Sequence, residues 1–205
     1  MAELTEIKED SIQQQIIQAA QQLFERYGLH KVTMDDVARE IGKRRSSIYY
    51  YYKNKEEILD AAIEVEMREI LAEIGQAIAL APTFSQKLHA YCITRLRISQ
   101  TRRALYTMID SGMNTDDLPD FLKVRKMMYS RFRELEIPVI RRMLDFGIEQ
   151  GDIRTMPHQE QDDLILVLLS TLQGFKKEMV IRNSLDVVEP GVDMLINLII
   201  KGFKG

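Results

Sequence analysis

The residue types best suited to contacting a polyanion are concentrated in residues 42–55, whose sequence is GKRRSSIYYYYKNK. Cationic side chains and hydroxyl groups are the usual donors to phosphate oxygens, and arginine also hydrogen-bonds the edge of guanine. If this stretch is helical, the rings of Tyr49–Tyr52 cannot all face one core, because each residue advances by about 100° around the axis. A solvated charged face with spare aromatic rings is the plain alternative. The flanking pattern favours a nucleic-acid-binding surface.

Helices must position this stretch, because apolar residues recur at three- and four-residue spacing and strand-type alternation is absent. A polar leader, residues 1–10, precedes a first helix that a capping box of Ser11 and Gln14 opens and Gly28 ends. A second, short helix starts at Thr33, which can form a cap with Asp36 three residues on. A third spans about residues 44–51 after a turn at Gly42, with Ile48 and Tyr52, four residues apart, pointing inward. Two short helices joined by a glycine turn predict a helix-turn-helix.

The remainder of the chain also reads as helix. Asn54 and Glu57 cap a fourth helix that Pro82 stops after about residue 80. Thr83 and Gln86 cap the next, and further amphipathic segments follow to the end of the chain. The predicted fold is all-α, with a three-helix head and a larger C-terminal helical bundle, about nine helices in total. Residues 1–55 are expected to form the head and residues 56–205 the body.

Composition fits this division. The chain has 205 residues, 45% hydrophobic and 29% charged, with one cysteine and no segment that looks like a signal peptide or membrane span, so a cytoplasmic protein without membrane contact is expected. Residues 31–55 hold seven basic and three acidic residues, whereas residues 56–205 hold 19 basic and 23 acidic. Attraction to DNA depends on the local field, so a basic head on an acidic body suits a DNA-binding protein.

The residues from Ile16 to Leu59, IIQAAQQLFERYGLHKVTMDDVAREIGKRRSSIYYYYKNKEEIL, resemble the tetracycline-repressor (TetR/AcrR) family of bacterial transcriptional regulators. The family's fixed points that recur here are Ala19, Ala20, Leu23, Phe24, Gly28, Thr33, Val37, Ala38, Gly42, Tyr49, Tyr51, Lys55 and Leu59. The resemblance covers about the first quarter of the chain. It departs from the family at Lys43 and Arg44, where the family has a small apolar residue and a helix-capping serine.

The resemblance implies DNA contacts in the head. Phosphate contacts are expected from Thr33, Tyr49, Tyr51 and Lys55. Entry into the major groove is expected of Lys43, Arg44, Arg45, Ser46, Ser47 and Tyr50. Arg45 is the predicted guanine contact, because a guanidinium pairs with both acceptors of that base. The alternative is that Arg44 and Arg45 only neutralise phosphates.

The body is expected to hold a small-molecule effector and a dimer interface. Methionine and aromatic side chains adapt to varied apolar ligands, and the candidate lining is Tyr91, Tyr106, Met108, Met113, Phe121, Met128 and Phe132. For any one of them, a place in the core is the plainer interpretation. The last two helices carry more apolar residues than one thin body is expected to cover, so a homodimer is predicted through Leu168, Leu169, Leu172, Leu195, Ile196 and Ile199.

Enzymatic sites are not indicated. Residues 116–120, DDLPD, fit the spacing of a magnesium-pyrophosphate motif, but Pro119 lies inside it and no second acidic motif follows, so a helix start explains it better. The three histidines lie without ligand spacing, so no catalytic residue, metal or cofactor is expected. The predicted function is a homodimeric repressor that a small molecule releases from palindromic double-stranded DNA. The alternative is a helical adaptor module whose basic head binds protein.

Overall fold

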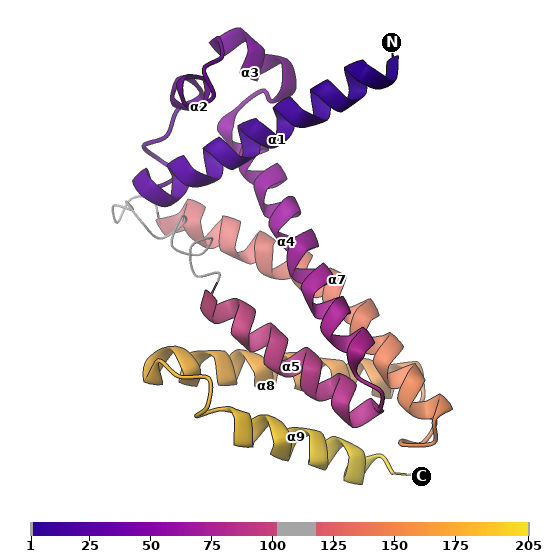
Figure 1. The fold of residues 1–205 in the computed structure, drawn as a ribbon. Helices are drawn as coiled ribbons and strands as arrows, with labels where there is room; N and C mark the ends of the chain where they lie inside the picture. Colours follow the sequence, from indigo (N-terminus) through magenta and orange to yellow (C-terminus); the bar gives the residue numbers. More distant parts are fainter. Residues whose placement is uncertain (1, 102–117, 205) are drawn as a thin grey trace. The chain divides into compact units, whose positions relative to one another are not determined.

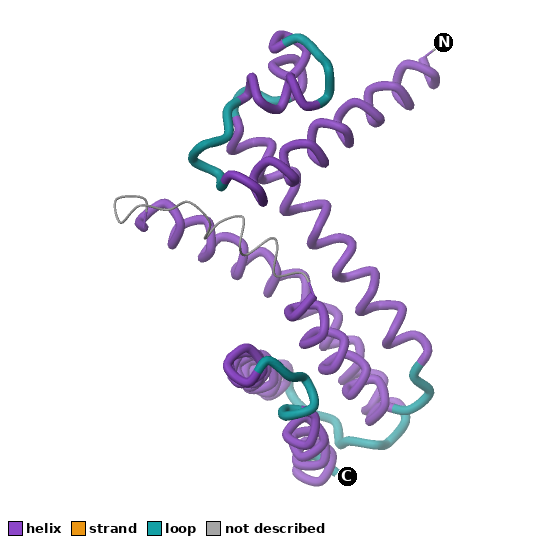
Figure 2. The backbone as a smooth tube through the Cα atoms, turned by 60° about the vertical axis from the view of Figure 1, so that its left-hand side comes forward, coloured by secondary structure: helices purple, strands orange, loops and turns teal. Residues whose placement is uncertain are grey.

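The computed structural model describes the backbone of residues 2–101 and 118–204 and the side chains of residues 11–101 and 126–204. Regular structure in these ranges is entirely helical (Figures 1 and 2), which confirms the predicted all-α class. The described helices are α1 (Ala2–Tyr27), α2 (Met34–Glu40), α3 (Arg45–Tyr51), α4 (Lys55–Leu80), α5 (Phe84–Thr101), α7 (Leu118–Glu149), α8 (His158–Arg182) and α9 (Glu189–Gly202). None of these helices is long and apolar enough to cross a lipid bilayer.

Two compact units divide the chain, and both α4 and α7 run from one unit into the other. The first unit ends at Arg68 in α4 and also takes in α7 as far as Tyr129, and the second takes the rest of the described chain. The units therefore separate inside α4, beyond residue 55. The predicted domain boundary at that residue stays a prediction.

The first unit packs the short helices of the head around a few large apolar side chains. Ile16 and Phe24 of α1, Val37 of α2 and Ile48 of α3 are all fully buried. α2 contacts both α1 and α3. A seven-residue helix is too short to be stable alone, so α2 and α3 depend on this shared core.

Local capping signals in the sequence predicted most helix starts correctly. The N–H of Glu57 donates to Asn54 Oδ1 at 2.9 Å before α4, and the N–H of Gln86 donates to Thr83 Oγ1 at 3.3 Å before α5. The predicted cap at Ser11 is wrong, because α1 already begins at Ala2 and Ser11 lies inside it. Its hydroxyl instead accepts from Gln15 Nε2, one turn later.

The second unit has its core where α5 meets α8 and α9. Leu88 and Leu96 of α5 are buried together with Ile140 and Leu144 of α7. α7 approaches α5 closely at Gly147, where an added Cβ would lie 2.8 Å from the Phe84 ring. A glycine at this position is therefore a packing requirement.

A polar cluster lies inside this core. Glu136 is buried and accepts from Arg95 Nε at 2.5 Å and from the Tyr91 hydroxyl at 3.0 Å. Burial raises the pKa of Glu136, against the lowering effect of Arg95. The Arg95 guanidinium also lies 4.3 Å from the centroid of the Phe132 ring. Removing one partner of such a cluster would leave an uncompensated buried charge.

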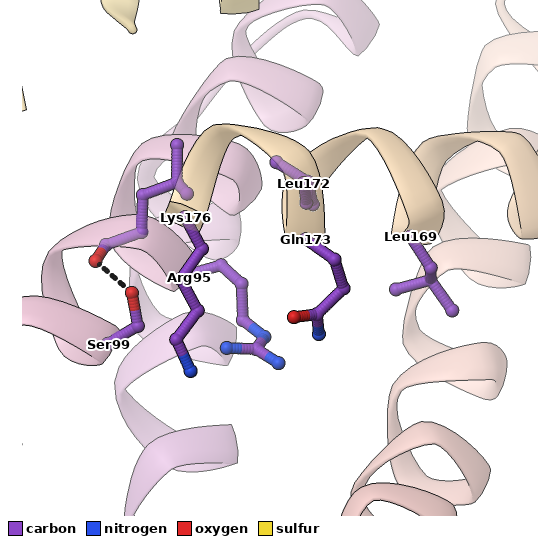
Figure 3. Close-up of a pocket in the computed structure, with 7 residues that line it drawn as sticks. Arg95, Ser99, Leu169, Leu172, Gln173 and Lys176 are labelled. Atoms are coloured by element: carbon purple, nitrogen blue, oxygen red, sulfur yellow. Dashed lines mark hydrogen bonds between the residues drawn. The ribbon is translucent and has the colours of Figure 1, made fainter. Parts of the chain in front are cut away.

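The predicted effector-pocket residues are only partly brought together. Tyr91 and Phe132 both belong to this polar cluster, whereas Met128 is buried in the first unit. The predicted lining residues Tyr106, Met108 and Met113 lie outside the described residues, and so does the side chain of Phe121. The cavity beside the cluster has a volume of only about 10 Å³, room for about one water molecule (Figure 3).

The predicted dimer residues are covered within one chain, and their part in a dimer stays a prediction. Leu168, Leu169, Leu172, Ile196 and Ile199 are buried within the single chain, and Leu195 packs against the same core. Figure 3 shows Leu169 and Leu172 lining the interior cavity from α8. The premise that one chain cannot cover these side chains is wrong, because α5 lies against both terminal helices and supplies the missing surface.

Candidate nucleic-acid interface

The turn at Gly42 sets the direction of α3. Gly42 has a φ of +64°, a left-handed conformation that glycine adopts without strain. The N–H of Lys43 donates to Ala38 O at 2.9 Å, which satisfies a carbonyl at the end of α2. α3 then begins after Arg44, which provides no side-chain cap, as the departure from the family's serine suggested.

The outer face of α3 carries the predicted DNA-contacting side chains. Ile48 is the buried residue of this helix, so the residues around it are turned outward. Tyr50 is 72% exposed and Tyr49 is 41% exposed. Also exposed are Lys43, Arg44, Arg45 and Ser46, while Ser47 and Tyr51 are partly buried. Cations, hydroxyl groups and rings therefore share one surface of the head.

A shallow hollow lies beside this surface, between α3 and the N-terminal half of α1. Its volume is about 330 Å³. Ile12 of α1 forms one side of it, and the other lining residues are Lys43, Ser46, Ser47, Tyr50 and Tyr51. Half of the ten predicted DNA-contacting residues therefore surround one concave surface rich in hydrogen-bond donors.

Arg45 is held by two neighbours at the surface. One terminal nitrogen, Nη1, donates to Asp35 Oδ2 at 3.0 Å, and the other, Nη2, donates to the Tyr49 hydroxyl at 3.0 Å. The guanidinium carbon lies 5.2 Å from the centroid of the Tyr49 ring, a cation–π distance. The Tyr49 hydroxyl, followed by the Asp35 charge, raises the pKa of Arg45.

The Lys55 side chain is hydrogen-bonded within the head. Its ammonium donates to the carbonyl oxygens of Leu29, His30 and Val32 at 2.9, 3.3 and 3.3 Å. A lysine ammonium has three N–H groups, so these contacts use all of them. The structure therefore gives Lys55 a structural role, in which the start of α4 fastens the segment between α1 and α2, and its phosphate contact stays a prediction.

Thr33 is likewise engaged in its own helix start. Its hydroxyl donates to Asp36 Oδ2 at 2.7 Å and accepts from the N–H of Asp36 at 3.3 Å, which completes the predicted capping of α2. These hydrogen bonds from Thr33 lower the pKa of Asp36. Because the hydroxyl proton is already donated within the head, Thr33 is not a ready phosphate ligand.

The comparison with protein families matches the part of the chain that contains this surface. Residues 16–62 match the model described as bacterial regulatory proteins, tetR family. This segment belongs to the tetR family. The head of this regulator is thus a DNA-binding domain of a transcriptional regulator.

Related proteins agree with that assignment. The chain is 23% identical over 139 residues to an uncharacterized HTH-type transcriptional regulator, YhgD of Bacillus subtilis, which covers 68% of this chain and 70% of YhgD. It is 31% identical over 74 residues to the Fatty acid metabolism regulator protein of the same organism, which covers 36% of this chain and 38% of that protein.

Solved structures match the fold over almost the whole length. FadR of Bacillus halodurans, a fatty acid degradation regulator, matches with a TM-score of 0.65 at 19% identity, covering 90% of this chain and 93% of FadR. FadR of Bacillus subtilis, solved with stearoyl-CoA, matches with a TM-score of 0.65 at 18% identity, covering 89% and 96% of the two chains. At these identities the likeness concerns the fold alone.

The ion pair of Asp35 with Arg45 was not predicted, because no local sequence pattern links Asp35 to a residue that lies ten positions later on another helix. No cluster of metal-binding side chains occurs among the described residues either. Asp116 and Asp117 of the DDLPD motif lie outside the described part of the chain, and α7 starts directly after them at Leu118.

The three hydrogen bonds of the Lys55 ammonium form a clamp, and its contribution to the free energy of unfolding can be measured. Lys55→Met keeps the length of the apolar stem but removes the donors to three carbonyl groups, so the free energy of unfolding should fall by about 2 kcal/mol. Urea unfolding followed by circular dichroism measures this change. The matched control is Lys53→Met, because Lys53 is an exposed cation in the same short segment, and its removal should change stability by less than about 0.5 kcal/mol. Equal stability of both variants, with DNA affinity lost only in Lys55→Met, would restore the phosphate contact.

Proposed function

We propose that this tetR-family regulator is a homodimeric repressor that binds a pseudo-palindromic operator and leaves it when a small molecule binds. The observation that carries the proposal is the outer face of α3, where exposed cations and hydroxyl groups surround a single buried anchor, Ile48. Such a face supplies donors for phosphates and an arginine for a base edge. Two copies related by a two-fold axis would present two such faces to a symmetric site.

The proposed DNA contacts come from the hydrogen-bond donors on the outer surface of the head. Lys43 and Arg44 neutralise phosphates, and Arg45 hydrogen-bonds a guanine in the major groove. The hydroxyl of Tyr49 accepts from Arg45 and keeps its own proton to donate to a phosphate. The hollow beside α3 receives the sugar-phosphate backbone against Ser46, Ser47, Tyr50 and Tyr51.

The alternative, a head that binds protein, fits the charge less well. Lysine is depleted in the cores of protein interfaces, whereas the segment 31–55 holds seven basic residues against three acidic. The relative YhgD is named as an HTH-type transcriptional regulator. Salt dependence separates the two candidates, because release of counterions from DNA is steeply salt-dependent.

A second copy of the chain is the proposed partner of α8 and α9. These helices lie side by side in Figures 1 and 2 and approach closely where Gly191 meets the Phe175 ring. Ile181 of α8 is 76% exposed, and Met194 and Leu198 of α9 are 61% and 60% exposed. Met194 and Leu198, four residues apart, lie on one face of α9. The dimer contact is therefore moved from the buried stripe of these helices to their exposed apolar side chains.

A groove in the second unit is the proposed effector site. It lies among α4, α5 and α7 and has a volume of about 670 Å³, within the range of small-molecule sites. Most of its lining is apolar: Leu71, Ala72, Gly75, Ile78, Ala79, Leu135, Pro138, Val139, Met143 and Phe146. Its charged side chains are Lys87, Arg142 and Glu134, two cations against one carboxylate. Of the predicted lining residues with described side chains, Tyr91, Met128 and Phe132, none lines this groove.

These features favour an elongated apolar effector with one anionic group. Lys87 Nζ donates to Ile78 O at 3.0 Å, and Arg142 Nε donates to Pro138 O at 3.3 Å, so each cation is held at the groove while retaining further N–H groups. FadR of Bacillus subtilis, which has a similar fold, was solved with stearoyl-CoA, a ligand of this class.

Release would be a population shift carried by α4. This helix runs unbroken from Lys55, at the clamp in the head, to the groove-lining residues near its end. An effector that prefers a body geometry unsuited to the operator lowers DNA affinity, and by linkage DNA lowers effector affinity by the same factor.

The operator is the first test. DNA selected from a random pool should contain a pseudo-palindrome whose half-sites are centred about 34 Å apart, or farther if two dimers share a longer site. If Lys43 and Arg44 of both heads each neutralise a phosphate, log K should fall against log salt with a slope of about −4. Selection followed by affinity measurement from 50 to 200 mM salt, a range in which DNA affinity is steeply salt-dependent, checks both. Enrichment of no sequence, with a flat salt response, would favour the protein-binding head.

The dimer surface is tested by adding charge. Changing Met194 and Leu198 together to Glu should give folded monomers, because two carboxylates would have to be desolvated in an apolar contact. Analytical ultracentrifugation gives the mass. Leu80→Glu is the control, since Leu80 is an exposed apolar residue at the end of α4 and its change should leave the dimer intact. An unchanged dimer of the double variant would place the interface elsewhere.

The effector groove is tested at Gly75. An added Cβ there meets nothing within 4 Å, so Gly75→Phe should fill the groove without strain, and replacing a helical glycine favours the helix. The probes are oleate, stearoyl-CoA and the uncharged oleyl alcohol. Oleate or stearoyl-CoA should release wild-type protein from operator DNA, with at least tenfold less effect on Gly75→Phe, a loss of about 1.4 kcal/mol or more in effector binding.

Gly75→Ala is the matched control, because it gains the same helix preference and leaves most of the groove open. It should respond like the wild type. Equal release of all three proteins would exclude the groove. If oleyl alcohol released the protein from operator DNA as strongly as oleate does, the effector would not need an anionic group.

A further inference from the structure

Asp35 is an acidic side chain on the side of the head that otherwise presents cations. It lies in the first turn of α2, only partly buried, and forms an ion pair with Arg45 of α3. An acid near a DNA-binding surface repels phosphates and therefore weakens non-specific binding. Its position beside Arg45, the predicted base contact, suggests that it improves discrimination between DNA sequences.

We propose that Asp35 is a specificity-determining residue: it positions Arg45 to read a guanine and keeps that arginine off the phosphates. This rests on the proposed function, in which α3 enters the major groove. Asp35 does not contact DNA in this scheme. It acts through the guanidinium that it holds from the α2 side, while Tyr49 holds the same group from within α3.

The donor count allows this arrangement. An arginine side chain has five N–H donors, of which one goes to Asp35 and one to Tyr49, so three remain. A bidentate contact with the O6 and N7 atoms of guanine uses two. A guanidinium fixed on two sides before binding loses less conformational freedom on reaching the base than a freely rotating one.

Phosphate competition explains why one of the two supports is a carboxylate. A flexible exposed arginine meets many phosphates on any sequence, and each such contact adds affinity without discrimination. Pairing with Asp35 opposes these contacts, because the guanidinium would have to leave a counter-charge. Only a base edge approached at the held geometry gains a bidentate contact without breaking the pair.

The test compares Asp35→Asn with a control that removes equal charge from the same helix. Glu40→Gln is that control, because Glu40 is exposed in the last turn of α2 and Asp35, not Glu40, is the acid that pairs with Arg45. Both variants should bind random-sequence DNA a few-fold more tightly. Asp35→Asn alone should lose about tenfold discrimination for guanine at one position of each half-site and show a steeper salt slope, as Arg45 turns to phosphates.

Two further variants separate positioning from folding. Tyr49→Phe removes the second support and keeps the ring, so it should weaken preference at the same base position. Arg45→Ala should abolish that preference, and adding Asp35→Asn to it should lower discrimination no further, since the acid acts through the arginine. Melting temperatures of all variants report whether the head stays folded.

The outcomes distinguish this inference from the function on which it rests. A wild-type protein that selects no DNA sequence would overturn both. A wild type that selects an operator, with Asp35→Asn keeping full preference at every position, would overturn the role of Asp35 alone. Loss of discrimination by Asp35→Asn in the absence of Arg45 would also overturn it, because the acid would then act by another route.

Discussion

The burial of Ile48 is the constraint on which the DNA-binding surface depends. α3 has seven residues and Ile48 is its buried one, so this contact sets which way the helix is turned. Isolated helices shorter than about 12 residues are marginal in water, so α3 exists because its anchor is covered by the core of the head. Once Ile48 is inside, the period of the helix turns Arg45, Ser46, Tyr49 and Tyr50 outward together.

Two further interactions turn that orientation into a defined surface. Lys55 joins the first residue of α4 to three carbonyl groups of the segment before α2, which closes the head on itself. Asp35 then joins α2 to Arg45 on the outside. A helix-turn-helix held at both its inner and outer edges can present side chains in a fixed geometry, and fixed geometry is what recognition of a base edge requires.

The core of the second unit is held together differently from that of the head. It is apolar and large, yet it encloses Glu136 with Arg95 and Tyr91, whose mutual contacts offset the cost of removing charge from water. This cluster and the neighbouring leucines leave an interior cavity too small for an effector. Space for one lies instead in the groove where α4 passes α5 and α7, so binding there and the position of α4 would be linked directly.

The sequence by itself determined what local interactions control. The starts of α2, α4 and α5 were predicted from caps formed within three residues, and the inward place of Ile48 followed from helical period. Only the tertiary structure decided the partners of Arg45 and Lys55 and the cover over the leucines of α8 and α9. Periodicity indicates that a face is buried, but the element that covers it is distant in the chain. The same leucine stripe therefore fits both an interface and a core until α5 is placed against it.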